Sequence, residues 1–186
     1  MDKTELVKLC SRSWALTVLS LMANGVPGRT SPLAAAAGCG RTAIQASVMH
    51  LLDLGLLDKN PGHGHPLRAE YLLTRRGLQI AQWSAGLHNI VEPGADQLVL
   101  RSKWSLPLIS CLPVETRYGE LRRQLSPVTD RALSLCLKEL TQRRWIARSV
   151  KADVAPPAVS YRLADAGSRV YGHLQSLAIN HEVTIG

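Results

Sequence analysis

The stretch YGELRRQLSPVTDRALSLCLKELTQRRWIARSV, residues 118–150, contains the pattern that decides the fold. Its middle part repeats apolar residues at the spacing i, i+3, i+4, i+7. The four positions are Leu133, Cys136, Leu137 and Leu140. This spacing places all four on one side of a helix, so it predicts an amphipathic helix with that side against a core.

The segments around this helix predict a hairpin and further helices. Ser126-Pro127 has the form of an N-cap followed by proline at the first helical position, which predicts that the helix begins there and continues to about Arg143. The other predicted elements are a short helix at 104–112, a helix with a basic face at 118–125, strands at 145–150 and 158–163 around Pro156-Pro157, and a final helix at 165–180. Three helices, a hairpin and a helix form the order of a winged helix.

The chain also repeats itself. Ser13–Leu19 aligns with Lys103–Ile109, and Tyr71–Gly77 aligns with Tyr161–Gly167, both at an offset of 90 residues. Between them, residues 42–51 align with residues 131–140 at an offset of 89. A period of about 90 residues is that of a small domain rather than of a solenoid repeat. We therefore expect two domains, 1–92 and 93–186, joined near Glu92-Pro93-Gly94.

The first copy is predicted to follow the same plan. Its elements would be a long helix from a Thr4 cap to Ala23, an Ala-rich helix opened by Ser31-Pro32, a helix at 42–53, a hairpin at 56–73 and a helix at 74–91. The matching residues Trp14 and Trp104 lie in apolar surroundings and are predicted to belong to the cores. The expected fold class is mainly α with small β-hairpins, built as two tandem winged helix-turn-helix domains.

Composition limits the possible functions. The 186 residues are 46% hydrophobic with a net charge of +8, which excludes general disorder and predicts a polyanionic partner, nucleic acid before an anionic membrane. The longest apolar run is too short to span a membrane. Residues 1–23 could pass for a secretory signal, but Asp2 and Glu5 and the return of the pattern near residue 103 favour a folded segment. Four scattered cysteines predict buried thiols in a reducing compartment, without a disulfide framework.

The second copy resembles the HxlR-type winged helix-turn-helix regulators, a branch near the MarR group. The matching pieces are Lys103–Leu106, Arg117–Arg123, Ser126 with Leu133 and Leu137–Leu140, and Pro156–Leu163 followed by Gly167. The resemblance implies a DNA-binding transcriptional regulator, usually dimeric, with its third helix in the major groove and its wing beside the phosphates. The cysteine that relatives often have just before the Lys-Trp pair is absent, since residues 98–102 contain none.

Helical geometry selects the candidate DNA contacts. The side of the third helix opposite its apolar stripe is expected to meet the bases, and basic residues nearby are expected to hold phosphates. The base-edge candidates are Thr129, Arg131 and Ser134. The candidates for phosphate contact in the second copy are Arg117, Arg122, Arg123, Lys138, Arg148 and Lys151. The candidates in the first copy are Arg41, Thr42, Gln45 and Arg68. Residues 93–186 hold more net charge than residues 1–92, so the second copy is expected to supply more of the contacts.

The leading hypothesis is a cytoplasmic, nucleoid-associated regulator of transcription, more often a repressor than an activator, that binds double-stranded DNA. The alternative is a tandem winged-helix module for protein–protein interaction in a chromosome or assembly complex. A phage or mobile-element role for the same fold stays open. No catalytic pattern, cofactor or metal site is expected, although His63 and His65 with Cys39 or His50 could be imagined as metal ligands. The chain could form a homodimer through its first and terminal helices. Alternatively, the two copies within one chain could take the place of the two subunits of a dimer.

Overall fold

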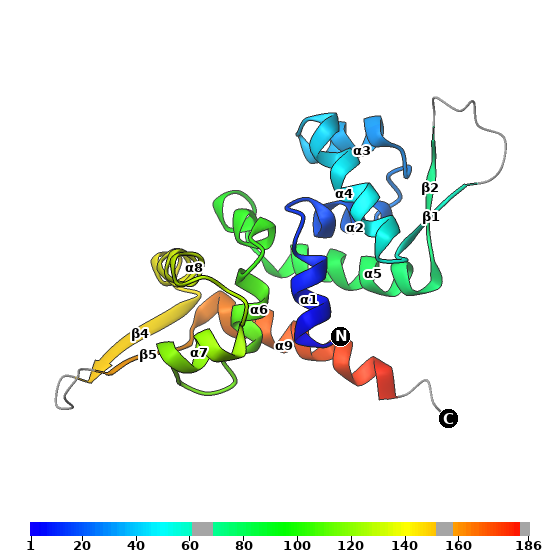
Figure 1. Ribbon diagram of the computed structural model, residues 1–186. Helices are drawn as coiled ribbons and strands as arrows, with labels where there is room; N and C mark the ends of the chain where they lie inside the picture. Colours follow the sequence, from blue (N-terminus) through cyan, green and yellow to red (C-terminus); the bar gives the residue numbers. More distant parts are fainter. Residues whose placement is uncertain (61–68, 152–157, 183–186) are drawn as a thin grey trace. The chain divides into compact units, whose positions relative to one another are not determined.

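The computed structural model describes residues 1–60, 69–151 and 158–182, with side chains described up to 150 in the second of these ranges and up to 177 in the third. The chain forms two compact units (Figure 1). The N-terminal unit is Leu9–Asn89, and the C-terminal unit consists of Met1–Lys8 together with Ile90–Gly186. The predicted boundary had placed the first eight residues with the N-terminal half. The fold class, mainly helical with small antiparallel sheets, is confirmed.

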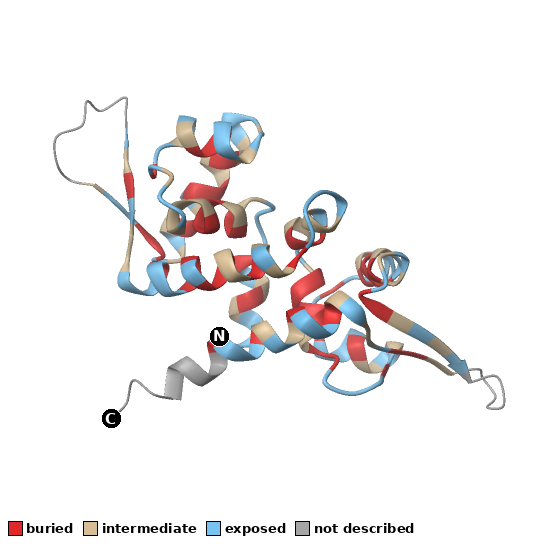
Figure 2. Cartoon of the chain, turned by 180° about the vertical axis from the view of Figure 1, so that it is seen from behind, coloured by how far each residue is buried: buried red, intermediate tan, exposed pale blue. Residues whose placement is uncertain are grey.

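The C-terminal unit has the element order of a winged helix. Its elements are α1 (Lys3–Leu9, whose last residue falls in the other unit), η1 (Ala95–Arg101), α6 (Ser105–Ser110), β3 (Thr116–Arg117), α7 (Tyr118–Gln124), α8 (Asp130–Gln142), β4 (Ile146–Lys151), β5 (Ala158–Leu163) and α9 (Asp165–Glu182). The strands form an antiparallel sheet in the order β3-β5-β4, with Ile146 opposite Leu163. All four residues of the predicted stripe of α8 are buried, and Trp145, at 0% exposure, follows them into the core (Figure 2).

The N-terminal unit contains a comparable set of elements. They are α2 (Ala15–Ala23), α3 (Thr30–Ala37), α4 (Arg41–Asp53), β1 (Leu57–Lys59), β2 (Tyr71–Leu73) and α5 (Arg75–Ile90, whose last residue falls in the other unit). The two strands pair antiparallel with Leu57 opposite Leu73. The predicted core positions of α4, which are Ile44, Ser47, Val48 and Leu51, are all buried.

Each unit contains a tight contact between its last helix and the backbone just before its first hairpin strand. A Cβ at Gly77 would lie 1.9 Å from the carbonyl oxygen of Leu56, and one at Gly167 would lie 2.0 Å from that of Trp145. The same two carbonyls accept the N–H groups of Thr74 and Ala164. Glycine is required at both positions because any side chain would overlap the backbone.

The structure corrects two predicted helix boundaries. The expected helix from Thr4 to Ala23 is two helices, because the polar residues 11–13 interrupt the apolar pattern and the chain turns there. The third helix of the C-terminal unit begins at Asp130 rather than at Ser126-Pro127. Thr129 is its N-cap, and its hydroxyl oxygen accepts the N–H of Ala132 at 3.2 Å, so the hydrogen-bonding group that begins the helix lies three residues later than expected.

Other differences are small and have local reasons. Strand β3 and the 3-10 helix η1 were not predicted. Strand β3 has only two residues and η1 is short, so neither shows a periodic pattern of apolar residues. Trp14 and Trp104 are half-buried instead of fully buried, because each takes the N-cap position of its helix, where one side of the ring stays open to solvent. The turn expected at residues 60–66 and the one at Pro156-Pro157 fall largely outside the described residues.

Candidate nucleic-acid interface

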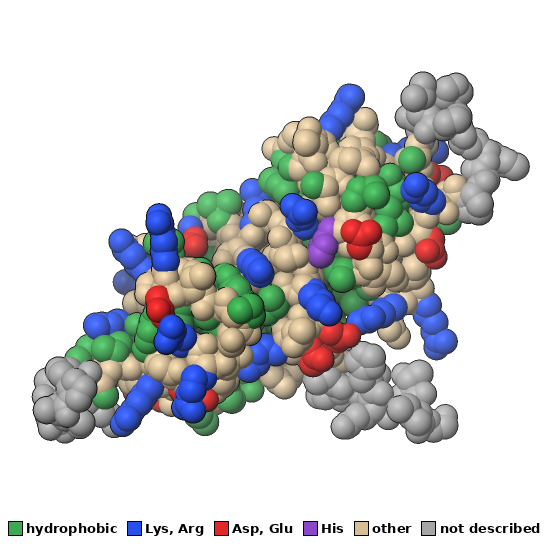
Figure 3. All heavy atoms as spheres, viewed as in Figure 1, with side chains coloured by type: hydrophobic (Ala, Val, Ile, Leu, Met, Phe, Trp, Pro, Cys, Tyr) green, Lys and Arg blue, Asp and Glu red, His purple; other side chains and the backbone are tan. Residues whose placement is uncertain are grey.

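The outward side of α8 is polar, basic and free of core contacts. Its exposed residues are Asp130, Arg131, Ser134, Leu135 and Lys138. They lie opposite the buried stripe, as the sequence predicted, because the 13-residue helix is amphipathic along its whole length. On the side drawn in Figure 3, Lys and Arg side chains gather over α8 and the hairpin, with fewer Asp and Glu side chains among them. Neither Arg131 nor Lys138 forms an ion pair with any described residue.

The first turn of α8 is held in place by its neighbours. Thr129, a predicted base contact, caps the helix: its hydroxyl oxygen accepts the N–H of Ala132, which occupies one of the lone pairs of that oxygen. The Tyr118 hydroxyl, from the start of α7, lies 3.2 Å from Asp130 Oδ1 and 3.4 Å from the oxygen of Ser134. These contacts fix the rotamers of two exposed side chains on the outward side of α8, which is a form of preorganisation for binding.

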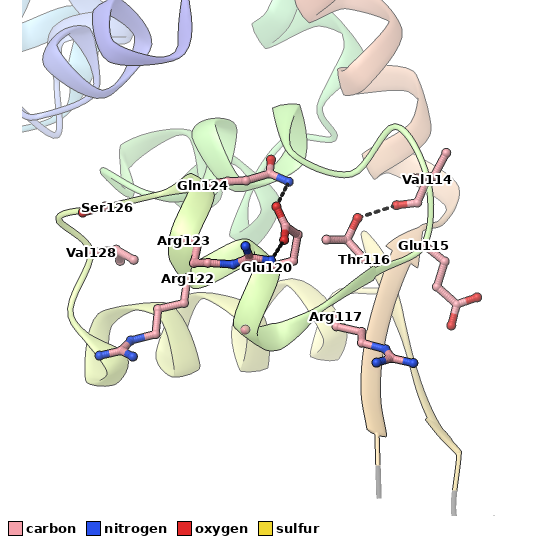
Figure 4. Close-up of a pocket in the computed structure, with 11 residues that line it drawn as sticks. Val114, Glu115, Thr116, Arg117, Glu120, Arg122, Arg123, Gln124, Ser126 and Val128 are labelled. Atoms are coloured by element: carbon pink, nitrogen blue, oxygen red, sulfur yellow. Dashed lines mark hydrogen bonds and ion pairs between the residues drawn. The ribbon is translucent and has the colours of Figure 1, made fainter. Parts of the chain in front are cut away.

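The two arginines of α7 are not equivalent. Arg122 forms an ion pair with Asp130 across the gap to α8, with 2.7 Å between Nε and Oδ1. Arg123 instead folds back along α7 to Glu120, which also accepts a hydrogen bond from Gln124 at 2.9 Å (Figure 4). Both arginines were predicted to hold phosphates, and both must exchange a carboxylate for the phosphate in order to do so.

An open groove lies beside α7. It has a volume of about 1030 Å³, and three of the predicted phosphate ligands line it: Arg117, Arg122 and Arg123. Arg117 ends β3, where its backbone pairs with Ser160, and its side chain is exposed. The structure therefore brings together three arginines from the loop and helix that precede α8.

The hairpin β4–β5 supplies the wing. Arg148 is exposed on β4 opposite Tyr161. Lys151 is the last residue of β4, and its side chain lies outside the described residues. Arg162 on β5 is exposed too, opposite Ala147, so it faces the other side of the hairpin from Arg148.

The corresponding side of the N-terminal unit offers fewer free groups. Arg41 and Thr42 are exposed in the first turn of α4. Gln45 is half-buried, because its Oε1 accepts the Thr30 hydroxyl at 2.7 Å and its Nε2 lies 3.5 Å from the Tyr71 hydroxyl. The preceding helix α3 exposes Ser31, Ala35 and Ala36 and contains no basic residue. Arg68 lies outside the described residues.

Sequence reasoning gave no role to Tyr118 and Asp130, which the structure places at the centre of the interface. The sequence signal was weak: an aromatic residue at the start of a helix and an acidic residue in the first turn of the next one. Only the packing of α7 on α8 brings the two within hydrogen-bonding distance.

Three of the four cysteines are buried, and none of the four forms a disulfide bond. Burial raises the pKa of the Cys10 thiol to about 12 and that of Cys136 to about 11. Burial also raises the pKa of the Cys111 thiol. Cys39 was predicted to be buried, and the structure shows it half-buried. His63 and His65 lie outside the described residues, and the described side chains contain no group of three metal-binding residues. Within the same part of the chain, no helix has the length and apolar character needed to cross a membrane.

A helix pair whose second member exposes a polar, basic side, followed by a hairpin with an exposed arginine, defines the C-terminal unit as a winged helix-turn-helix domain of the DNA-binding class. Residues 99–182 match the HxlR-like helix-turn-helix family. These residues lie in the C-terminal unit, which is thus similar in sequence to a family of DNA-binding transcriptional regulators without enzymatic activity.

Two solved structures are similar to part of the chain. One is a putative MarR-family transcriptional regulator from Porphyromonas gingivalis W83, with 26% identity over 47% of this chain and 85% of that one, at a TM-score of 0.41. The other is a putative MarR-family transcriptional regulator from Enterococcus faecalis V583, with 32% identity over 46% of this chain and 77% of that one, at a TM-score of 0.40. Comparison with curated proteins gave no match.

Proposed function

We propose that the protein is a sequence-specific regulator of transcription that inserts α8 into the major groove of double-stranded DNA, and that it acts as a repressor. The observation that carries this proposal is the outward side of α8. It presents Arg131 and Ser134 in the first two turns, where a recognition helix meets base edges. Arginine is the usual bidentate partner of guanine, so Arg131 is the principal base contact in this proposal.

Phosphate contacts would surround this reading helix. Lys138 lies further along α8, and Arg148 lies on the wing; both side chains are exposed. Arg117, Arg122 and Arg123 would hold a phosphate at the groove beside α7. Contacts of this kind give affinity and register without sequence information, so they would support binding to any duplex.

We further propose that the two units are copies of one winged-helix domain, and that the C-terminal copy does most of the reading. The paired glycines Gly77 and Gly167, each against a backbone carbonyl, support the common origin. The internal hydrogen bonds of Gln45 and the Ala-rich α3 support the unequal roles. In this proposal, the two copies of the duplicated sequence are residues 1–92 and residues 93–186.

The likeness to MarR-like regulators also supports a homodimer. These regulators are typically dimeric, and a dimer formed through α1 and α9 would place two α8 helices on one operator. The chain would then work in the cytoplasm at the nucleoid. Light scattering of the full-length protein tests the dimer, which requires twice the chain mass of 20.3 kDa.

The decisive experiment is selection of bound duplexes from a random library by the full-length protein. We expect a recurrent site, palindromic if two α8 helices read it, and nanomolar binding at physiological salt. A library that shows no enrichment, together with no duplex binding in a salt titration, would overturn the proposal.

A second candidate is favoured by the N-terminal unit alone. Helix α3 lacks the arginines that α7 has, and Gln45 on α4 forms hydrogen bonds within the unit. This unit could therefore bind a protein partner while the other unit binds DNA. Under this candidate, substitutions on α4 leave duplex binding unchanged but remove a partner in pull-down from the native host.

A further inference from the structure

We propose that Asp130 limits the phosphate affinity of the C-terminal unit, because its carboxylate holds Arg122 in competition with DNA phosphate. The residue would thereby weaken binding to duplex of any sequence, so that strong binding requires base contacts in addition. This inference rests on the proposed function and adds to it a residue that sets the strength of the phosphate contacts.

The geometry places one carboxylate oxygen between two helices. Asp130 is the first residue of α8, and its Oδ1 lies 2.7 Å from Nε of Arg122 near the end of α7. The hydroxyl of Tyr118, at the start of α7, donates to the same oxygen at 3.2 Å. The carboxylate is therefore oriented from both ends of α7, and its guanidinium partner is held beside the reading helix.

The location favours a negative charge that remains available for exchange. Asp130 is the first residue of α8, and the positive end of the helix dipole is a favourable place for a negative charge. The Arg122 and Asp130 side chains are 59% and 60% exposed, so solvent and an approaching phosphate can reach both. An exposed ion pair is weak, and a phosphate can displace the carboxylate from Arg122. Each displacement leaves Asp130 without its partner and close to the phosphate backbone, which opposes binding.

The base contact does not bear this cost itself. Arg131 is the next residue, and it forms no ion pair with a described residue, so it can reach a base edge without breaking one. A random duplex depends on phosphate contacts alone, so lowering their contribution in every complex leaves strong binding only to a site that also offers the base contact. The position aligned with Asp130 in the N-terminal unit, at an offset of 89, is Arg41. The carboxylate is therefore a feature of the C-terminal unit.

The test is a salt titration of the full-length protein with a random duplex and with the selected site. The variants are Asp130→Asn, Asp130→Ala, Arg122→Gln and the double variant Asp130→Asn with Arg122→Gln. Glu92→Gln, which removes an exposed carboxylate next to the junction of the units, is the charge-matched control. Unfolding curves of all variants establish that each is folded.

We expect Asp130→Asn and Asp130→Ala to bind the random duplex several-fold more tightly and to steepen its salt slope by about 0.9, the value for one additional phosphate contact. The affinity for the selected site should rise by a similar factor, because Arg122 meets a phosphate in both complexes. Arg122→Gln alone should change the salt slope by much less than the Asp130 substitutions do. In the double variant, the loss of Arg122 should remove the gain in affinity for the random duplex that Asp130→Asn produces.

Three results would overturn the inference while the proposed function stands. They are an unchanged slope in both Asp130 variants, an equal gain in Glu92→Gln, and a gain that survives in the double variant. A wild-type protein that binds neither duplex would overturn both the inference and the proposed function, so the two failures are distinguishable.

Discussion

Arg131 and Arg148 are both exposed cations without an ion pair to any described residue, and we propose that they contact different parts of a duplex. Arg131 lies in the first turn of α8, and Arg148 lies on the wing. We expect Arg131→Ala to lose about 1–3 kcal/mol of preference between the selected site and a single-base variant of it. We expect Arg148→Ala to weaken all duplexes alike and to flatten the salt slope by about 0.9. Fluorescence anisotropy over a range of salt measures both, and equal effects of the two substitutions would contradict the assigned roles.

Thr129 has a structural role that the sequence analysis did not predict. The sequence placed it among the base contacts, and the structure places its hydroxyl on the N–H of Ala132 at the beginning of α8. We expect Thr129→Ala to lower the free energy of unfolding by about 1 kcal/mol through loss of the cap, whereas Thr129→Ser retains it. Denaturant unfolding of the two variants measures the difference. Equal stability of the two would show that the cap contributes nothing.

At the scale of elements, the contact between α9 and the end of α8 depends on a missing side chain. Gly167 packs against the Trp145 carbonyl, whereas Gly172 in the same helix has no atom within 4 Å of its would-be Cβ. We expect Gly167→Ala to destabilise the protein by roughly 2–4 kcal/mol, because the backbone must shift to admit the methyl group. The matched control Gly172→Ala should stabilise it by about 0.5–1 kcal/mol, as alanine does inside a helix. Thermal unfolding that ranks the two variants in the opposite order would refute this packing.

Helix η1 has an anchoring role that the sequence did not reveal. Asp96 accepts from Arg143 Nη1 at 3.0 Å and from Trp145 Nε1 at 3.3 Å, so η1 is tied to the end of α8 and to the start of the wing. Neither partner was identifiable beforehand, because Asp96 lies 47 and 49 residues away from them along the chain.

At the scale of the whole molecule, the two units are expected to contribute unequally to DNA binding. We expect the double substitution of Arg41 and Thr42 by alanine to reduce duplex affinity by less than threefold, because Gln45 beside them is already hydrogen-bonded inside the unit. Arg131→Ala in the same full-length protein is the comparison. A larger loss from the Arg41 and Thr42 variant, measured on the selected site, would reverse the assignment of the principal reading unit.

The cysteines report on the folding of both units. Cys10 lies in the N-terminal unit, and Cys111 and Cys136 lie in the C-terminal unit, all three buried. Burial disfavours the thiolate and raises the pKa of each thiol, so little of the reactive form exists at pH 8. We expect a thiol reagent at pH 8 to modify only the half-buried Cys39 rapidly, and all four cysteines in denaturant. Rapid modification of two or more in the folded protein would show that a core is open.

The sequence by itself determined most of the elements and their order, although not β3, η1 or the division between α1 and α2. The stripe of α8, the strand Ala158–Leu163 and the basic residues around them were predictable, because periodicity and turn chemistry depend on near neighbours in the chain. The boundaries were less accurate: Ser126-Pro127 has the local form of a helix start, but the capping bond forms at Thr129.

Only the tertiary structure decided which charged groups are available to a partner. Arg122, Arg123 and Gln45 read as free groups in the sequence, and the fold gives each of them an internal partner. The same packing turned Asp130 from an ordinary acidic residue at a helix start into the partner of two side chains on α7. The physical reason is that an ion pair or hydrogen bond depends on distances of about 3 Å between separate elements, which residue spacing along one helix does not encode.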